Sequence, residues 1–146
     1  MIKGAPYVPT RGERVEKMIV LSGLKAGETM MDFGSGDGRI VFAAAKTGAQ
    51  CIGVEINPLL YWRSEYRRRA MQLKNAQFLR KDLWTIDLRG VDVLTLYFIS
   101  HKMEKLKEKI VREMRPGARV VSHGFTFPDW QSEAKDDTVY LYLVQK

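Results

Sequence analysis

The segment that decides the fold runs from Met31 to Ile40 and reads MDFGSGDGRI. Apolar residues precede three glycines at alternate positions, Gly34, Gly36 and Gly38, and a helical pattern of apolar residues follows at once. Glycines have no Cβ atom, so a ligand can approach the backbone closely, and the N-terminus of a helix offers free N–H groups. The segment therefore predicts a strand, a tight turn and a helix that together hold a nucleotide-like ligand.

An acidic residue two positions before the glycines helps to identify the ligand. A carboxylate at Asp32 would repel a pyrophosphate but suits the ammonium group of an amino-acid-bearing cofactor, and Arg39 stands where the dinucleotide fingerprint has its third glycine. The pattern resembles motif I of the S-adenosylmethionine methyltransferases. We therefore expect S-adenosylmethionine, or its product S-adenosylhomocysteine, to contact Asp32, Gly34, Ser35 and Gly36; the alternative is a glycine-rich turn without a ligand.

Two more carboxylates follow the next two predicted strands. Glu55 lies near the end of the apolar segment Gln50–Ile56, about 20 residues beyond the glycines, where a carboxylate can bind both ribose hydroxyls. Asp82 follows Ala76–Leu79, and in the methyltransferase pattern the residue at this place faces the adenine amino group. Taken alone, Asp82 would be interpreted as a surface turn residue.

Length and composition limit the classes of protein. A chain of 146 residues suits one methyltransferase domain over residues 1–146, with residues 1–28 as a lead-in and helix. The longest apolar run, Val91–Ile99, contains Asp92 and is shorter than the roughly 20 residues of a membrane helix. Cys51 is the only cysteine, which excludes an internal disulfide and a multi-cysteine zinc site, so no metal is expected.

The N-terminus lacks the apolar region of a signal peptide, so we expect a cytoplasmic protein without a membrane partner. The net charge of +7 has two interpretations, an ordinary charged surface or a surface that attracts polyanions. The oligomeric state is not fixed by the sequence, and we expect a monomer.

The order of the predicted elements indicates the fold class. Strands alternate with helices up to the strand Ala118–Phe127, and the last strand, Thr138–Val144, follows without a long helix. This order predicts an α/β, Rossmann-like class I methyltransferase fold with a mostly parallel sheet and an antiparallel edge strand. A sixth strand is expected to be short or vestigial, with Trp130–Glu133 as its only candidate.

Two helices have patterns that predict which side faces the core. The helix that begins at Pro58 carries an apolar stripe, which we expect to be buried, comprising Leu59, Trp62, Tyr66, Ala70 and Leu73. The helix after Val91–Ile99 is expected to turn its basic residues outward, namely Lys102, Lys105, Lys107, Lys109 and Arg112.

Five segments in order carry a more specific resemblance: Tyr7–Thr10, Asp32–Ile40, Gly53–Asn57, Lys81–Trp84 and Pro116–His123. Together they resemble the small class I protein-lysine methyltransferases, a group with an archaeal broad-specificity member and mitochondrial members that act on the adenine nucleotide translocase and the ATP synthase c-subunit. The resemblance implies methyl transfer from S-adenosylmethionine to the ε-amine of exposed lysines in protein substrates. The chain lacks the membrane-targeting segment of the mitochondrial members, so their membrane-embedded substrates are not expected here.

The resemblance also implies cofactor contacts outside the glycine turn. Tyr7 and Thr10 are expected to close over the cofactor, although Thr10 alone would be interpreted as a helix cap. Asn57 is expected to contact the nucleoside or, failing that, to cap the helix that begins at Pro58. Ile56 and Leu83 complete the expected cofactor-binding set.

Methyl transfer to lysine needs an uncharged amine in a dry site, since the usual pKa of lysine is near 10.4. Tyr97 and Phe98 are expected to be the catalytic pair, lining a narrow opening in which aromatic faces contact the amine and its methylated product; core packing is the alternative. His123 is a candidate general base near the end of a strand, and His101 is more typical of a surface cap.

Two other functions stay open. The basic charge also suits an RNA or other nucleic-acid methyltransferase, but the proline-containing segment of adenine-N6 enzymes is missing at Leu96–Ile99. A protein that binds S-adenosylmethionine without catalysis is the second alternative, because binding residues alone do not prove turnover.

Overall fold

The structure of the protein, a computed structural model, describes residues 12–97 and 102–145. Four residues of the predicted site or its surroundings lie outside the described residues: Tyr7, Thr10, Phe98 and His101. The helices are α1 (Gly12–Ser22), α2 (Arg39–Ala45), α3 (Pro58–Ala70) and α4 (Met103–Glu113), with a 3₁₀ turn η1 (Leu83–Thr85). The strands are β1 (Thr29–Phe33), β2 (Gln50–Val54), β3 (Ala76–Leu79), β4 (Val93–Leu96), β5 (Arg119–His123), β6 (Ala134–Asp136) and β7 (Val139–Leu143).

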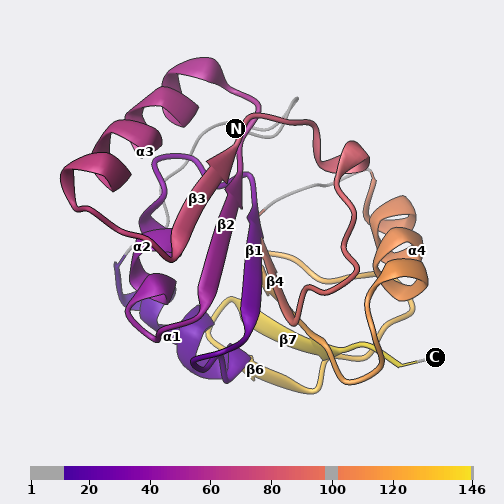
Figure 1. The fold of residues 1–146 in the computed structure, drawn as a ribbon. Helices are drawn as coiled ribbons and strands as arrows, with labels where there is room; N and C mark the ends of the chain where they lie inside the picture. Colours follow the sequence, from indigo (N-terminus) through magenta and orange to yellow (C-terminus); the bar gives the residue numbers. More distant parts are fainter. Residues whose placement is uncertain (1–11, 98–101, 146) are drawn as a thin grey trace.

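The strands form one sheet in the order β3-β2-β1-β4-β5-β7-β6. Strands β1 to β5 run parallel, and β7 pairs antiparallel with both β5 and β6. Helices α1, α2 and α3 lie on one side of this sheet and α4 lies on the other (Figure 1). The predicted α/β fold with an antiparallel edge is confirmed.

The sixth strand is short, as predicted, but its predicted place was wrong. It spans Ala134–Asp136 and not Trp130–Glu133. The Trp130 ring instead packs against Phe127 and Tyr142, with ring centroids 5.1 and 4.9 Å away. Side-chain packing thus holds the segment that precedes the strand.

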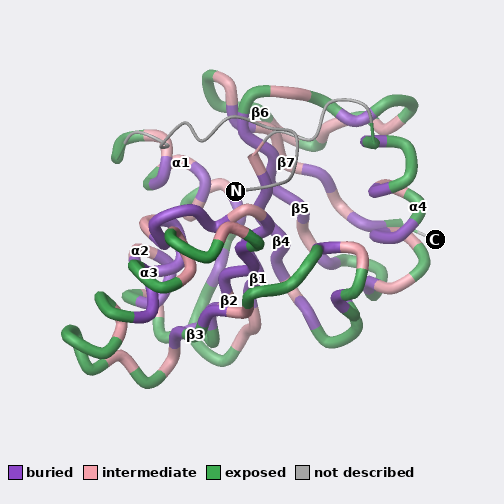
Figure 2. Tube along the Cα trace, turned by 90° about the horizontal axis from the view of Figure 1, so that it is seen from above, coloured by how far each residue is buried: buried purple, intermediate pink, exposed green. Residues whose placement is uncertain are grey.

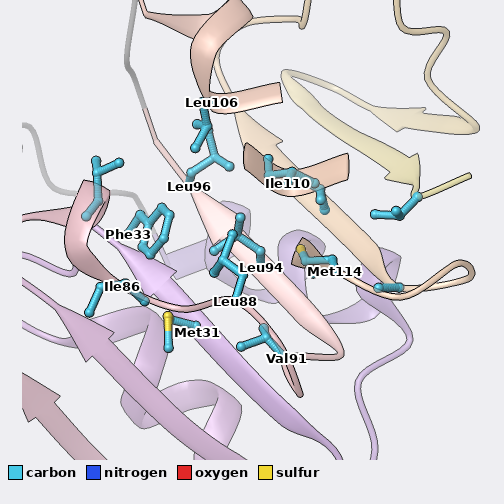
Figure 3. Packing of buried hydrophobic residues seen from close by; sticks show 14 of the residues in the cluster. Met31, Phe33, Ile86, Leu88, Val91, Leu94, Leu96, Leu106, Ile110 and Met114 are labelled. Carbon is cyan, nitrogen blue, oxygen red and sulfur yellow. The ribbon is translucent and has the colours of Figure 1, made fainter. Parts of the chain in front are cut away.

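The core has two parts, one on each side of the sheet. On the α4 side, Phe33, Leu94 and Leu96 of the central strands meet Leu106 and Ile110 of α4 (Figure 3). All five are buried. The strands β1 and β4 that carry the middle of the site are therefore fixed by apolar packing close to their ends.

Helix α4 differs from its prediction at one basic residue. Lys109 was expected to face solvent, but it is only 6% exposed. Its Nζ donates to the carbonyl of Ile86 and pairs with both carboxylate oxygens of Glu113 at 3.0 Å. Glu113 also accepts from the Leu88 N–H at 2.9 Å. The buried pair therefore ties α4 to the loop before β4, a constraint that helical periodicity does not encode.

Helix α3 also differs from its prediction, in the opposite sense. The stripe expected in the core is largely exposed: Leu59 is 79% exposed, Trp62 59% and Tyr66 76%. The buried residues are Ser64 and Glu65. Because α3 packs beside the edge strand β3, at the margin of the molecule, only a narrow side of it meets the sheet (Figures 1 and 2).

The five parallel strands end level with one another. The pairing register aligns the last positions of four strands, Leu79, Val54, Phe33 and Leu96, with Ser122, one residue before the end of β5. We call this end of the sheet the carboxyl edge. In open α/β sheets, ligands bind outside the carboxyl ends of the strands.

Candidate functional site

The residues that follow the level strand ends face one another along the carboxyl edge. The glycine turn follows β1 and Glu55 follows β2, while Tyr97 follows β4 and His123 ends β5. We call the ends of β1, β2 and β3 the glycine-turn side, and the ends of β4 and β5 the tyrosine–histidine side. Neighbouring strands lie about 4.8 Å apart, so the two sides meet between β1 and β4.

The glycine turn is fixed by backbone hydrogen bonds. The N–H groups of Gly34 and Ser35 donate to the Val54 carbonyl at 2.9 and 3.1 Å, and the Gly38 N–H donates to the Ser35 carbonyl at 2.9 Å. Gly34, Gly36 and Gly38 have φ values of 74°, 58° and 86°. This left-handed region favours glycine, so the predicted strand, turn and helix are confirmed.

Glu55 clamps this turn. Its side chain is buried; Oε1 accepts from the Gly36 N–H at 2.8 Å and Oε2 accepts from the Asn57 N–H at 2.9 Å. Ser64 of α3 donates to the Gly36 carbonyl at 3.1 Å, which fixes the same turn from the other side. A carboxylate has about four acceptor positions, so a ribose contact remains compatible with these bonds and stays a prediction. The clamping role was not predicted.

Asp32 is buried in β1 beside β4. Thr95, its register partner, donates a hydrogen bond from Oγ1 to Asp32 Oδ1 at 2.7 Å. Burial raises the pKa of Asp32 to about 7, and the bond from Thr95 opposes this shift. Thr95 was not predicted as part of the site, although a threonine between Leu94 and Leu96 in an apolar strand is a signal for it.

Close packing of the turn against β2 explains one further glycine. A Cβ atom on Gly53 would lie 2.6 Å from the Phe78 ring and 2.8 Å from the Ser35 Cβ, closer than real Cβ atoms come. The Ser35 side chain therefore lies against β2, and its buried Oγ has no hydrogen-bond partner within the described part of the chain. A cofactor contact from Ser35 stays a prediction.

The other predicted cofactor residues have local roles in the structure. Asn57 caps α3, with Oδ1 accepting from the N–H groups of Leu59 and Leu60, which is the alternative role foreseen for it. Asp82 is exposed and caps η1 through the Trp84 N–H. Their cofactor contacts stay predictions.

Two apolar residues were also placed in the cofactor-binding set. Ile56 is exposed beside Glu55, whereas Leu83 is buried in the core on the α4 side. The structure therefore leaves Ile56 open to a ligand and gives the Leu83 side chain a packing role.

Tyr97 and His123 form the other side of the site. Their rings lie 5.0 Å apart between centroids, at an interplanar angle of 54°. His123 is buried, and its Nδ1 has no hydrogen-bond partner among residues 12–97 and 102–145. Burial lowers the pKa of His123 below 6.5; the Arg14 guanidinium lowers it further, and the Asp137 carboxylate opposes both. His123 is thus neutral at pH 7 and can accept a proton.

These residues fit an amino-acid-bearing nucleoside. Asp32 is a buried carboxyl with a hydroxyl partner, so a ligand ammonium group would stabilise its charged form. In the described ranges no three His, Cys, Asp or Glu side chains are arranged to bind a metal ion. No helix of those ranges is long and apolar enough to cross a membrane.

Comparison with known proteins identifies the family. A family model described as the ANTKMT methyltransferase domain matches residues 32–134, which include the glycine turn, Glu55, Tyr97 and His123. The chain belongs to this family. It is 37% identical over 142 residues to the ATP synthase c-subunit lysine N-methyltransferase of Mus musculus, covering 94% of this chain and 57% of that protein. The chain thus spans just over half the length of that relative.

Two other relatives match over nearly their whole length. A protein-lysine N-methyltransferase of Saccharolobus islandicus is 32% identical, with 95% of this chain and 93% of that protein covered. A solved structure described as an RNA methyltransferase from Salinibacter ruber, in complex with S-adenosyl-L-homocysteine, is 33% identical with a TM-score of 0.90 and covers 94% of each chain. The names of these relatives therefore differ in the substrate but agree on methyl transfer.

Proposed function

We propose that this protein transfers a methyl group from S-adenosylmethionine to the ε-amino group of lysine in protein substrates. The observation that carries the proposal is the carboxyl edge, where the glycine turn and Glu55 lie beside the Tyr97–His123 pair. The names of the Mus musculus and Saccharolobus islandicus relatives support lysine as the acceptor.

The glycine-turn side would hold the cofactor. Asp32 would bind its ammonium group, Glu55 its ribose hydroxyls and Asp82 the adenine amino group. When bound, S-adenosylmethionine supplies a methyl group made electrophilic by its sulfonium. The bonds from Gly36 and Asn57 to Glu55 fix the carboxylate before a ligand arrives, which reduces the entropy lost on binding.

The tyrosine–histidine side would prepare the acceptor. A lysine ε-amine is protonated in water, so it must lose a proton before it can act as a nucleophile. The aromatic face of Tyr97, with that of Phe98, would exclude water from the amine. His123 is neutral at pH 7 and carries an unpartnered Nδ1 within the described ranges, so we assign to it the role of proton acceptor.

A second candidate function is methylation of RNA. The description of the Salinibacter ruber structure favours it, and so does the group of arginines on α3, Arg63, Arg67, Arg68 and Arg69. Against it, no nucleic-acid-binding module is recognisable in the sequence, and the segment after β4 lacks the prolines of adenine-N6 enzymes.

One experiment separates these functions. The pure protein is incubated with S-adenosylmethionine carrying a labelled methyl group and with cell extract, and the products are treated separately with protease and with nuclease. We expect the label to be released by protease and to be found on lysine after acid hydrolysis. Label released by nuclease would establish the RNA function instead. Calorimetric binding of S-adenosylmethionine without label transfer to any extract would indicate a binding protein without catalysis.

A further inference from the structure

The exposed apolar side chains of the described residues gather on one helix. Leu59, Trp62 and Tyr66 follow one another on α3 at spacings of three and four residues, which places them on a single face. We call these three residues the α3 ridge. Among large apolar residues that are exposed in the described ranges, only Val20 lies away from α3 and its two flanking residues, Ile56 and Met71. Contiguous exposed apolar surface of this kind marks an interaction site.

The charges around the α3 ridge are all positive. Arg63 follows Leu59 by four residues and Arg69 follows Tyr66 by three, so both flank the ridge on the outer face. The side chain of Arg69 is 72% exposed. Glu65, the only acidic residue of α3, lies on the inner face and pairs with Arg68 at 3.0 Å and, more loosely, with Arg69 at 3.9 Å. The outer face therefore offers apolar and cationic groups without an anion.

Charge decides between the possible partners. A second copy of the same face would bring arginines against arginines, and the net charge of +7 would add to that repulsion. An anionic partner is complementary to both the face and the whole molecule. Single-stranded nucleic acid is bound in basic grooves in which bases stack on aromatic rings. The α3 ridge instead begins with Leu59, which has no aromatic face, and its three side chains are exposed on one helix.

We propose that the α3 ridge and its flanking arginines bind the surface of membranes that contain anionic phospholipids. Leu59, Trp62 and Tyr66 insert among the headgroups and upper acyl chains, and Arg63 and Arg69 contact lipid phosphates. A helix with Leu and aromatic residues beside Arg residues is typical of such interfacial binding. This proposal departs from the expectation of no membrane partner, which rested on the missing signal peptide and spanning segment. A helix that lies in the plane of the interface needs neither, so the binding is compatible with the short helices of the described ranges.

The position of α3 leaves the tyrosine–histidine side of the site accessible while the ridge is bound. Helix α3 packs beside β3, the strand at one edge of the sheet, while Tyr97 and His123 lie at β4 and β5. Two strands, β2 and β1, separate β3 from β4 (Figure 1). The proposal is independent of the substrate of methylation, and its test does not use enzyme activity.

The test measures co-sedimentation of the full chain with vesicles of phosphatidylcholine, with and without phosphatidylglycerol. We expect binding only to the anionic vesicles, and weaker binding as salt is added. Trp62→Ala should lower the partition coefficient by about tenfold or more, since a buried aromatic side chain is lost. Arg63→Gln and Arg69→Gln should each lower it by about fivefold.

Two matched control variants test whether the loss of vesicle binding is specific to the α3 ridge and its arginines. Val20→Ala removes an equally exposed apolar side chain from α1, and Arg89→Gln removes an exposed arginine far from α3 in the sequence; neither should change vesicle binding. Trp62→Phe should keep the binding but remove the vesicle-induced blue shift of tryptophan fluorescence. Thermal unfolding of each variant checks that the fold is intact.

Three results would overturn the proposal. The first is no sedimentation with anionic vesicles at low salt. The second is binding that the Leu59→Ala, Trp62→Ala and Tyr66→Ala triple variant retains. The third is tight binding of a single-stranded polyuridine probe that the triple variant loses while vesicle binding is unchanged, which would assign the ridge to RNA.

Discussion

The two sides of the carboxyl edge are built differently. On the glycine-turn side, the N–H groups of Gly34, Ser35 and Gly36 all have partners across the β1–β2 boundary. On the tyrosine–histidine side, Tyr97 and His123 meet through their rings, and the buried Nδ1 of His123 has no partner within the described ranges. The first side is rigid before any ligand binds, whereas the second retains a free acceptor in a buried place.

This difference suggests a division of work between the two sides. A preorganised side whose backbone N–H groups are already paired suits tight binding, because little order is lost when the ligand arrives. A buried neutral imidazole without a partner suits proton transfer, because the lone pair of its nitrogen is available to accept a proton. Changes on the glycine-turn side should therefore affect cofactor affinity, and changes on the tyrosine–histidine side should affect turnover.

The largest effect is expected for Glu55→Ala. The change removes the proposed ribose contact and leaves the Gly36 and Asn57 N–H groups without their acceptor. Two hydrogen bonds to a charged group are lost, so we expect affinity for S-adenosylmethionine and S-adenosylhomocysteine to fall about 1000-fold. Isothermal titration calorimetry measures both ligands.

The control for Glu55→Ala is Glu65→Ala, which removes a carboxylate of α3 that pairs with Arg68 outside the site. It should leave cofactor affinity unchanged. Equal affinities of Glu55→Ala and the wild type would show that Glu55 neither binds the ribose nor orders the turn.

The next largest effect is expected for His123→Asn, on the tyrosine–histidine side. His123→Asn should lower kcat by about 100-fold while the affinity for S-adenosylmethionine stays at the wild-type level. Since burial lowers the pKa of His123 below 6.5, the wild-type rate should fall only when the pH drops below that value. The variant should lack this acid limb, and steady-state rates across a pH series measure it.

A stability effect would confuse this comparison, so thermal unfolding of His123→Asn is measured in parallel. A variant that keeps the acid limb would assign the limb to another group. A variant that loses cofactor affinity together with kcat would remove the proposed division between the two sides.

The effect expected for Asp32→Asn is on stability, and it depends on pH. Burial raises the pKa of Asp32 from 3.8 to about 7, so the folded state holds this proton more tightly than the unfolded state. Wild-type stability should therefore fall as the pH rises from 3.8 to 7, and the variant should lack this fall. Above pH 7 the variant should be more stable by up to about 4 kcal/mol.

Binding of S-adenosylmethionine should show the converse pH dependence. We propose that the charged form of Asp32 binds the ligand ammonium, so wild-type affinity should decrease about tenfold per pH unit as the pH falls below 7. The variant should show weaker binding without this slope. Calorimetry and chemical denaturation over the same pH series measure both, and identical slopes for variant and wild type would contradict a role for Asp32 ionisation.

Sequence patterns predicted those parts of the fold that depend on local chemistry. Alternate glycines at Gly34, Gly36 and Gly38 favour left-handed backbone, so they predict a tight turn, and the structure has one there. The strand Ala76–Leu79 matches its predicted bounds because apolar alternation is a property of the strand itself. These signals need no knowledge of which elements are neighbours.

Features that depend on neighbouring elements were not predictable in this way. Lys109 is buried because Glu113 and the Ile86 carbonyl surround its ammonium group. Trp62 is exposed because α3 lies beside the edge strand β3. Helical periodicity indicates that two sides of a helix differ, but the position of the helix in the sheet decides which side is buried.

In the site, too, some features follow from local sequence and others depend on which elements are neighbours. The carboxylates Asp32 and Glu55 were found from their spacing to the glycines, but the bonds of Thr95 to Asp32 and of Gly36 to Glu55 depend on strand register. The contact between Tyr97 and His123 likewise arises because β4 and β5 are neighbours and end level. Spacing therefore predicted the carboxylates that are candidates for ligand binding, and strand register supplied the groups that hold them in place.

The smallest effect is expected for Tyr97→Phe, which separates the role of the Tyr97 ring from that of its hydroxyl. Tyr97→Phe keeps the aromatic face that would contact the acceptor amine, so kcat/KM should change by less than about threefold, whereas Tyr97→Ala should lower it about tenfold. Tyr140→Phe removes a hydroxyl from β7 and serves as the control, with no expected change. Steady-state rates with a lysine-containing protein acceptor measure all three. If Tyr97→Phe loses as much as Tyr97→Ala, the hydroxyl of Tyr97 and not its ring acts on the amine, and His123 is no longer the only proton acceptor to consider on that side.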